Sequence, residues 1–477
     1  MHVKSSAMAI QKSNKNRALH LTAGILLFAA VIFVLPREVF SFAARVASAT
    51  LFLMVYWWIT RPVHIAVTAL LPIIINSLFS IVPMADVLKN YASQIVVLLL
   101  GANILTITWK NTGLDKRIAL KSLCIIGTSV KGQLVVWFLL ATLLSTVLPN
   151  AVVAAALCPI AYAMMQYVTP QDEKPNKGLL NMILLMIAWG AGLGGFGTPL
   201  GGAMNLVAIT HIENFIGREF MFIEWVAKMM PYLALLSLGI VAYILLSPQP
   251  AKRLPGSADY FKDENKKMGA MERSQILALV LFAIPVVLSF ARPLYAEAFP
   301  EFKPFFAFLL FGFMAFIING EKGHRLITWD QAAKGINWGL MILFSGGIAV
   351  GNMLVATGTL EGISSLISSV DIQRTLPVIV VIIAFSMFLS NASSNTAAVA
   401  VAVPLVLGIV TVISDVPLKY VYITAAACNC AFLLPTSIRA IPVGYGLDTD
   451  YMFKKGFIGV AVTFAVLLAA GYAAVML

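Results

Sequence analysis

The segment Ser390-Asn391-Ala392-Ser393-Ser394-Asn395-Thr396 interrupts an apolar stretch that runs from residue 375 to 413. A second apolar stretch, 132–168, is interrupted halfway by Leu144-Ser145-Thr146-Val147-Leu148-Pro149-Asn150-Ala151. Small polar residues and a proline at the centre of such a stretch predict two helices that meet at a tip. Backbone groups that leave a helix cost several kcal/mol in lipid unless protein or water satisfies them. Each tip is therefore expected to line a cavity.

An internal repeat relates the two tips. A shift of the chain by 245 residues aligns Asn150 with Asn395, Pro159 with Pro404, Gly101 with Gly346, and Thr112-Gly113 with Thr357-Gly358. An odd number of expected spans separates the two copies, so we expect them to cross the bilayer in opposite directions. Inverted repeats with a binding site at their interface are typical of secondary transporters.

The composition predicts an all-α polytopic membrane protein. Of the 477 residues, 60% are hydrophobic and 11% are charged, whereas a soluble domain carries roughly 25% charged residues. Apolar windows long enough to cross a bilayer recur, and strands of alternating polarity are absent. We expect about eleven transmembrane helices plus two re-entrant hairpins, 132–168 and 375–413. The expected spans are 20–36, 41–60, 62–82, 93–112, 178–210, 224–247, 274–292, 304–320, 336–357, 419–446 and 452–476.

The basic residues predict the orientation. The net charge is +12, but the lysines and arginines are scattered between spans, which argues against nucleic-acid binding. Most lie on the same side as the N-terminus, so we expect a cytoplasmic N-terminus and an extracytoplasmic C-terminus in the cell (inner) membrane. No cleavage site follows the apolar run 19–36, which indicates a first span rather than a signal peptide.

Two further segments, Gly192–Gly202 and Leu434–Pro442, break expected spans with glycines and prolines. Half-helix ends and free carbonyls at four broken elements favour a binding site over simple hinges. No acidic residue falls in the middle of an expected span, whereas Arg439 does. Amides, hydroxyls and helix N-termini suit an anionic substrate. Arg439 is expected either to attract a substrate carboxylate or to brace the broken helix through backbone carbonyls.

Two hairpins with Ser-Asn-Thr tips, each followed by a broken helix, resemble the divalent anion:sodium symporter family of dicarboxylate carriers over residues 20–476. The best local match is Ser394-Asn395-Thr396 with Pro404 downstream. The resemblance implies a homodimer with a static scaffold and a transport domain that moves like an elevator. It also implies transport of C4 or C5 dicarboxylates such as malate, succinate or 2-oxoglutarate. The implied substrate-binding residues are Pro149, Asn150, Ala151, Thr198, Pro199, Ser394, Asn395, Thr396 and Ser437, joined by Arg439.

The same resemblance implies the domain organisation. Residues 1–19 would form a cytoplasmic tail, and 20–127 the first four scaffold helices. Residues 128–247 would hold the first hairpin and helices 5 and 6 of the transport domain, followed by a cytoplasmic linker, 248–273. Residues 274–371 would form scaffold helices 7 to 9, and 372–477 the second hairpin with helices 10 and 11.

The chain also departs from the family pattern. The first tip, Pro149-Asn150-Ala151, lacks both hydroxyls, and the Thr-Pro-Pro-Asn stretch after each hairpin is replaced by Gly202-Ala203-Met204-Asn205 and Ile438-Arg439-Ala440-Ile441. Sodium prefers several oxygen ligands, so these changes favour a sodium-independent anion exchanger. A sodium symporter stays open as the alternative, with Ser145, Asn150, Gly197, Ser390 and Asn395 as sodium ligands.

A polytopic membrane enzyme is the third hypothesis. It would require acidic or histidine pairs near the membrane surface. The chain offers only Asp448 with Asp450, which suit a solvated turn, and His64 and His211 near helix ends. We therefore expect a carrier, not an enzyme, that uses no cofactor.

Overall fold

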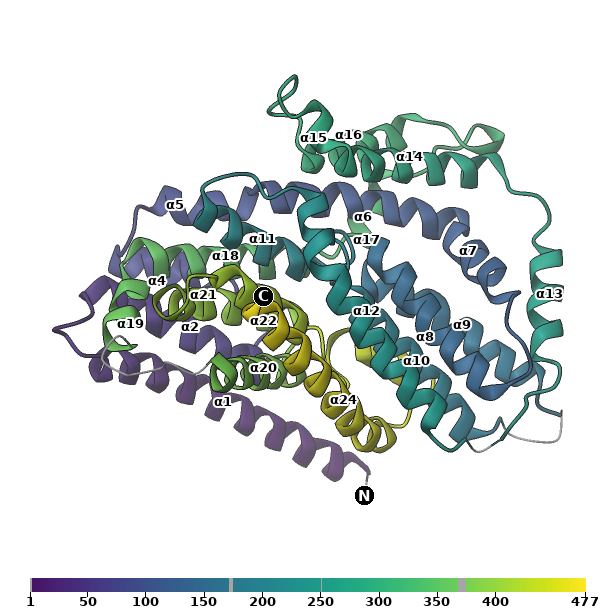
Figure 1. The fold of residues 1–477 in the computed structure, drawn as a ribbon, viewed down its shortest axis with the longest axis horizontal. Helices are drawn as coiled ribbons and strands as arrows, with labels where there is room; N and C mark the ends of the chain where they lie inside the picture. Colours follow the sequence, from purple (N-terminus) through teal and green to yellow (C-terminus); the bar gives the residue numbers. More distant parts are fainter. Residues whose placement is uncertain (1, 171–174, 250, 368–374) are drawn as a thin grey trace. The chain divides into compact units, whose positions relative to one another are not determined.

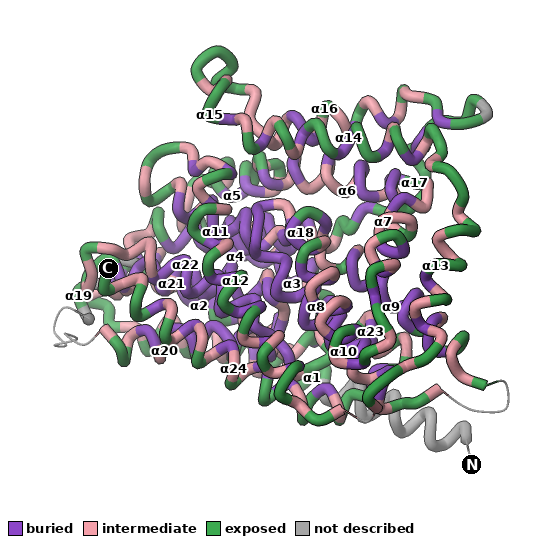
Figure 2. Tube along the Cα trace, turned by 45° about the vertical axis from the view of Figure 1, so that its right-hand side comes forward, coloured by how far each residue is buried: buried purple, intermediate pink, exposed green. Residues whose placement is uncertain are grey.

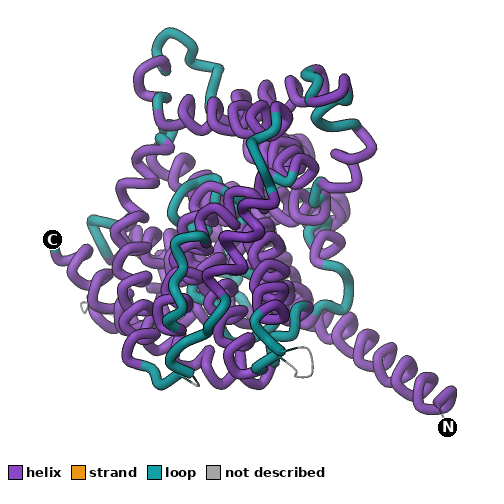
Figure 3. Tube along the Cα trace, turned by 90° about the vertical axis from the view of Figure 1, so that its right-hand side faces the viewer, coloured by secondary structure: helices purple, strands orange, loops and turns teal. Residues whose placement is uncertain are grey.

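The computed structural model describes residues 2–170, 175–249, 251–367 and 375–477, and these residues form only helices and loops (Figure 3). This confirms the predicted all-α class. The helices are α1 (His2–Val34), α2 (Phe42–Thr60), α3 (Ile65–Thr68), α4 (Leu71–Phe79), α5 (Met84–Leu88), η1 (Lys89–Ala92), α6 (Gln94–Thr112), α7 (Leu114–Leu123), α8 (Val130–Val147), α9 (Asn150–Tyr167), α10 (Lys177–Gly194), α11 (Ala203–Ile216), α12 (Phe222–Leu246), α13 (Ser257–Lys267), α14 (Arg273–Phe290), α15 (Arg292–Tyr295), α16 (Pro304–Ile317), η2 (Glu321–Gly323), α17 (Trp329–Gly335), α18 (Trp338–Ala356), α19 (Thr359–Ile367), α20 (Thr375–Ala392), α21 (Asn395–Ile413), α22 (Pro417–Ala427), η3 (Ser437–Arg439), α23 (Ala440–Gly444) and α24 (Thr449–Met476) (Figure 1).

Twelve helices of the described chain are long and apolar enough to cross a membrane, and four of them are the hairpin arms α8, α9, α20 and α21. Every predicted span has a helical counterpart, and the two broken spans are broken where predicted: α10 and α11 are separate helices, as are α22 and α23. The first helix begins far earlier than predicted, at His2 rather than near residue 20. An 18-residue arm is about 27 Å long, close to the thickness of the hydrocarbon core. Length alone does not separate a re-entrant hairpin from two spans, so the re-entrant course stays a prediction.

The chain divides into two compact units. Unit 1 comprises Met1–Val96, Trp338–Arg374 and Ala400–Pro417, of which residues 1 and 368–374 lie outside the described residues. Its central helix is α18, which contacts α2, α3, α4, α5 and α19. Most of α18 is buried, including Ser345, Gly346 and Gly347 (Figure 2). These small side chains allow neighbouring helices to approach closely.

Unit 2 comprises Val97–Asn337, Thr375–Val399 and Leu418–Leu477. Helix α10 packs on both arms of the first hairpin, α8 and α9, and also contacts α12 and α24. Helix α24 in turn packs along α12 and α20, the first arm of the second hairpin. Both hairpin tips and both broken segments therefore belong to this unit.

The internal repeat is also visible in where the helices begin and end. Three pairs of helices begin 245 residues apart: α5 and α17 at Met84 and Trp329, α7 and α19 at Leu114 and Thr359, and α9 and α21 at Asn150 and Asn395. The glycines that follow α6 and α18, Gly113 and Gly358, both have positive φ, at 68° and 73°. Glycine adopts this left-handed conformation without steric cost and ends helices for that reason.

Equivalent glycines of the two copies also mark close backbone contacts. A Cβ at Gly101 would lie 2.5 Å from the backbone of Phe308 in α16. A Cβ at Gly346 would lie 2.2 Å from the carbonyl oxygen of Ala69, which follows α3. Gly101 and Gly346, which the repeat aligns, are thus both positions where the backbone of a neighbouring segment leaves no room for a side chain.

We expect Gly101→Ala and Gly346→Ala each to lower the free energy of unfolding by about 1–3 kcal/mol, because the added methyl group overpacks a backbone contact. Gly132→Ala in α8 is the matched control, since its Cβ would meet nothing closer than 3.6 Å. Thermal unfolding of the detergent-solubilised protein measures the effect. Wild-type melting temperatures for both Gly101→Ala and Gly346→Ala would show that these contacts do not constrain the fold.

Candidate substrate site

The first hairpin tip is joined to the first broken segment by backbone and hydroxyl groups. Leu148 is extended and precedes Pro149, which ends α8 because the residue before proline avoids the helical conformation. The Asn150 amide N–H donates to the carbonyl of Gly201, at 3.3 Å. Across the same contact, the Thr198 hydroxyl donates to the carbonyl of Thr146. A Cβ at Gly201 would lie 2.3 Å from the Ser145 carbonyl oxygen, so only glycine allows this approach.

Asn205, at the start of α11, braces the first broken segment from its other end. Its Nδ2 donates to the carbonyls of Gly195 and Thr198, both at 2.7 Å. These two acceptors fix the orientation of the amide, because the opposite orientation would face oxygen to oxygen. The Oδ1 of Asn205 is then buried without a hydrogen-bond partner in the described structure. The first tip therefore retains one unsatisfied buried acceptor.

Arg439 fills the corresponding region of the second broken segment. The side chain is 2% exposed. Its guanidinium donates to five oxygens: the carbonyls of Leu434 at 2.8 Å, Ala431 at 3.1 Å and Ser390 at 3.3 Å, the Asn395 Oδ1 at 3.4 Å, and the Thr436 hydroxyl. These contacts are the ones expected of an arginine that braces the broken helix, whereas its contact with a substrate carboxylate stays a prediction. A buried guanidinium ringed by neutral oxygens still carries its full positive charge.

Three buried asparagines complete the second tip. Asn395 Nδ2 donates to Asn429 Oδ1 at 3.1 Å, and its Oδ1 accepts from the Ser390 hydroxyl at 3.1 Å as well as from Arg439. One of the two Asn395 amide hydrogens is thus committed to Asn429, which leaves one for a ligand. Asn391 bonds the backbone of Cys430, Phe432 and Leu433.

Within unit 2, the two tip regions are neighbours through the broken segments. Helices η3 and α23 contact α9 and α10. The rings of Trp189 in α10 and Phe432 stack edge to face with centroids 5.0 Å apart. A Cβ at Gly192 would lie 3.7 Å from Ile438 Cδ1, so the segment that carries Arg439 lies directly against α10.

The predicted site residues fall into three groups. Ser390, Asn395 and Arg439 are hydrogen-bonded to one another, and Thr198 bonds the first tip. Ser394 accepts from the Ala397 N–H and caps its own helix, while Ser145 donates to the Ala191 carbonyl. The third group has no side-chain hydrogen bond described and differs in burial: Pro149, Asn150 and Thr396 are half-buried, Gly197 is buried, and Ala151 and Ser437 are exposed. Ser437 has φ 56°, a left-handed conformation that is unusual for serine.

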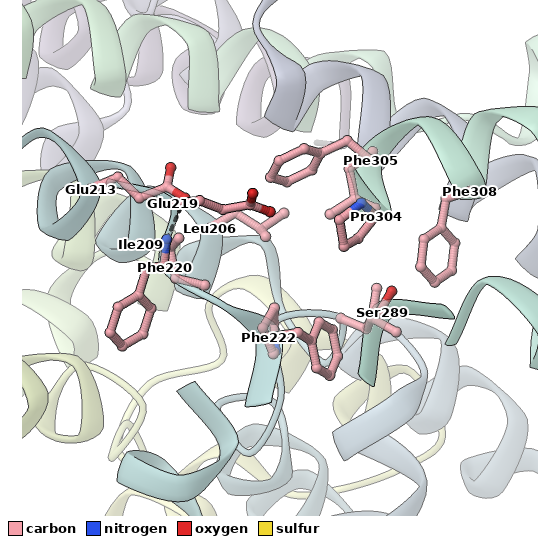
Figure 4. A pocket seen from close by; sticks show the side chains of 13 residues that line it. Leu206, Ile209, Glu213, Glu219, Phe220, Phe222, Ser289, Pro304, Phe305 and Phe308 are labelled. Atoms are coloured by element: carbon pink, nitrogen blue, oxygen red, sulfur yellow. Dashed lines mark hydrogen bonds between the residues drawn. The ribbon is translucent and has the colours of Figure 1, made fainter. Parts of the chain in front are cut away.

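Pro199 contributes instead to a different pocket of unit 2, which Figure 4 shows. Phenylalanines line it, and two carboxylates, Glu213 and Glu219, stand at one side. Glu219 pairs with the buried Arg292 at 3.0 Å, and Glu213 accepts from the Phe220 N–H. Acidic groups oppose anion binding, so this pocket is not the candidate site for a dicarboxylate.

Sequence reasoning missed Asn205, Asn391 and Asn429 as site residues. Each is an amide within or beside an apolar run, and each bonds the backbone of a broken segment or another tip amide. A polar side chain in an apolar run was the available signal, but it does not tell an interhelical contact from a site.

The comparisons with known proteins agree with this architecture. A family model described as "Citrate transporter" (CitMHS) matches residues 55–427. A sodium-dependent dicarboxylate transporter, SdcS, of Staphylococcus saprophyticus is 28% identical over 84% of this chain and 80% of its own length. SdcS of Staphylococcus aureus strain RF122 is 27% identical over the same shares of the two chains.

Among solved structures, the fold is similar to that of MtrF from Neisseria gonorrhoeae, described as one of a class of antimetabolite efflux pumps. The TM-score is 0.51 at 14% identity, over 81% of this chain and 83% of that chain. At this identity the likeness concerns the fold alone.

The family match, the helical repeat and the broken helices agree with one another. They confirm the resemblance to the divalent anion:sodium symporters and exclude the membrane-enzyme hypothesis, because the family consists of carriers. This polytopic membrane protein belongs to the citrate transporter (CitMHS) family of carboxylate carriers.

Proposed function

We propose that the chain carries small dicarboxylates of four or five carbons, such as malate, succinate or 2-oxoglutarate, by sodium-independent exchange. The observation that carries this proposal is the Arg439 guanidinium, which engages the oxygens of the second tip. Relatives that transport dicarboxylates with sodium support the substrate class. We infer exchange rather than sodium symport because a bound sodium ion can leave the site, whereas the positive charge of Arg439 cannot.

The argument is electrostatic. Neutral oxygens solvate the guanidinium but do not cancel its charge, and moving a fixed charge through a medium of low dielectric constant is costly. A bound dianion relieves that cost, so the loaded carrier moves and the empty carrier stalls. This is the behaviour of an exchanger. A sodium symporter differs because its empty site returns without the ion.

We assign the substrate to the tips and broken segments of unit 2. Asn150 and the remaining Asn395 amide hydrogen donate to the substrate carboxylates, with Ser394, Thr396, Thr198 and Ser437 around them and Arg439 behind. Half-helix N-termini at α9 and α21 add favourable dipoles. The elevator motion, the homodimer, and the cytoplasmic N-terminus with its linker at 248–273 belong to the same proposal.

A sodium-coupled symporter is the second candidate, and one observation favours it. The buried Asn205 Oδ1 lacks a partner in the described structure, and an unsatisfied acceptor beside the Thr198 carbonyl of the first broken segment is suited to a cation. The named relatives are sodium-dependent. The two candidates differ in what drives uptake, which makes them separable by experiment.

Substitution of the tip amides tests the site. We expect Asn150→Ala and Asn395→Ala each to weaken succinate binding about 10- to 150-fold, because each removes a hydrogen bond to a charged carboxylate. Asn103→Ala is the control, since Asn103 donates to the Leu99 carbonyl of its own helix. Calorimetric titration of the solubilised protein measures the affinity. Near-normal affinity in both tip variants would refute the assignment.

Counterflow in proteoliposomes tests the coupling mode. Uptake of radiolabelled succinate is measured with and without succinate inside, in sodium and in potassium buffers. We expect uptake to require internal succinate and to be equal in the two buffers. Strong uptake into empty vesicles under a sodium gradient would contradict the exchanger and establish the symporter, and no uptake under any condition would contradict the substrate class.

A further inference from the structure

We propose that Asn391 is the positioning residue of the second tip: its amide clamps the unwound segment 430–433 to the end of α20 and so holds the oxygens that Arg439 binds. The inference deepens the proposed function and rests on it for its effect on transport. The clamp itself is a structural claim that can be tested without any substrate.

The Asn391 side chain uses its whole hydrogen-bonding capacity. Its Nδ2 donates to the carbonyls of Met387 at 2.8 Å and Cys430 at 3.3 Å. Its Oδ1 accepts the backbone N–H groups of Phe432 and Leu433, both at 2.9 Å. An asparagine amide has two donor hydrogens and one oxygen with two lone pairs, so no valence is left for a substrate. With 6% of its surface exposed, Asn391 is an internal connector rather than a ligand.

The segment that Asn391 holds requires such a connector. Helix α22 ends at Ala427, and the next helical turn, η3, begins at Ser437. Cys428, Asn429 and Cys430 still donate their N–H groups to carbonyls of α22, but the peptide groups of residues 431–434 lie outside the helical ladder, where an unpaired buried group costs free energy. The two N–H donors and the carbonyl acceptor need partners of both kinds at one place, and the Asn391 amide supplies them while its second hydrogen binds the Met387 carbonyl. A carboxylate could not serve, because it lacks the donors.

Asn391 and Arg439 both form hydrogen bonds to the backbone of residues 430–434. Arg439 donates to the carbonyls of Ala431 and Leu434, whereas Asn391 bonds Cys430, Phe432 and Leu433. Arg439 also donates to the carbonyl of Ser390, the neighbour of Asn391 in α20. Residues 430–434 are therefore held at the end of α20 by the hydrogen bonds of two side chains, one neutral and one cationic. If the bonds of Asn391 are lost, the segment that carries the Ala431 and Leu434 carbonyls is free to shift away from Arg439.

The first half of the repeat has no equivalent clamp. The position 245 residues before Asn391 is Thr146, whose hydroxyl donates to Leu143 within its own helix. There the broken segment is braced by Asn205 instead, with one valence unsatisfied. The fully saturated amide occurs only at the tip that carries the fixed cation. This pairing indicates that Asn391 serves the placement of Arg439 and not the hairpin fold in general.

The experiment compares Asn391→Ala and the milder Asn391→Ser with wild type. The matched control is Asn76→Ala, because the buried Asn76 clamps a backbone in the same way through the N–H and carbonyl of Val82, in unit 1. Two quantities are measured: the maleimide labelling rate of Cys430, located by mass spectrometry, and the KM and Vmax of succinate exchange. Cys430 and Cys158 are both fully buried, and Cys158 in α9 serves as the internal reference.

We expect Asn391→Ala to label Cys430 at least about tenfold faster than wild type without a change at Cys158, since the local opening exposes only the released segment. The KM should rise about tenfold or more with Vmax within about twofold, and Asn391→Ser should lie between. Asn76→Ala should change neither quantity.

Unchanged Cys430 labelling would overturn the clamp, and so would equal acceleration at Cys158, which indicates general loosening. Faster Cys430 labelling with an unchanged KM would overturn the positioning role. The labelling result stands even if wild type transports no dicarboxylate, so failure of the clamp and failure of the proposed function are distinguishable.

Discussion

The structure of unit 2 depends on one requirement: the backbone carbonyls and N–H groups that are freed where its helices break must be hydrogen-bonded. A helix that unwinds in such a place must find replacement partners from the protein, because lipid offers none. At the second tip those partners are the Arg439 guanidinium and the Asn391 amide, and at the first tip they are Asn205 and the Thr198 hydroxyl. The positions of the tips, of the broken segments and of the glycines between them follow from these bonds and from the close approach that Gly201 permits.

The two halves of the repeat satisfy their freed backbone groups with side chains of different charge. The first tip is held by neutral groups and retains an unpaired acceptor on Asn205. The second is held by a cation that is covalently part of the chain. A bound sodium ion can dissociate before the empty carrier returns, so the empty site is neutral. A fixed arginine stays in the site, so the empty carrier must move its charge. The coupling mode that we propose is therefore a property of one side chain in an otherwise shared architecture.

The apolar periodicity and the 245-residue repeat were sufficient to predict the helical class, a helical counterpart for every expected span, and the place of each break. The starts of α9 and α21 agree with that repeat. Prediction succeeded there because Pro149 and the serines at 393–394 act locally, through backbone conformation and capping. The roles of Asn391 and Asn429 were missed because their partners are distant in sequence: Asn391 bonds residues 39 to 42 positions away, and Asn429 bonds Asn395, 34 positions away. Asn205 was missed because the carbonyls that it binds, 10 and 7 positions away, lie in a segment outside the helices. The long helical extension of α1 was also missed, since a polar segment can continue a helix without an apolar face.

The account depends most directly on the charge of Arg439. The decisive measurement is the ratio of succinate uptake into empty vesicles to uptake into succinate-filled vesicles, for wild type, Arg439→Lys and Arg439→Gln, normalised to folded protein. The account predicts a low ratio for wild type and for Arg439→Lys, which keeps the charge, and a clearly higher ratio for Arg439→Gln, which has no fixed cation at this position. A ratio that stays low in Arg439→Gln, or one that rises equally in Arg439→Lys, would contradict it.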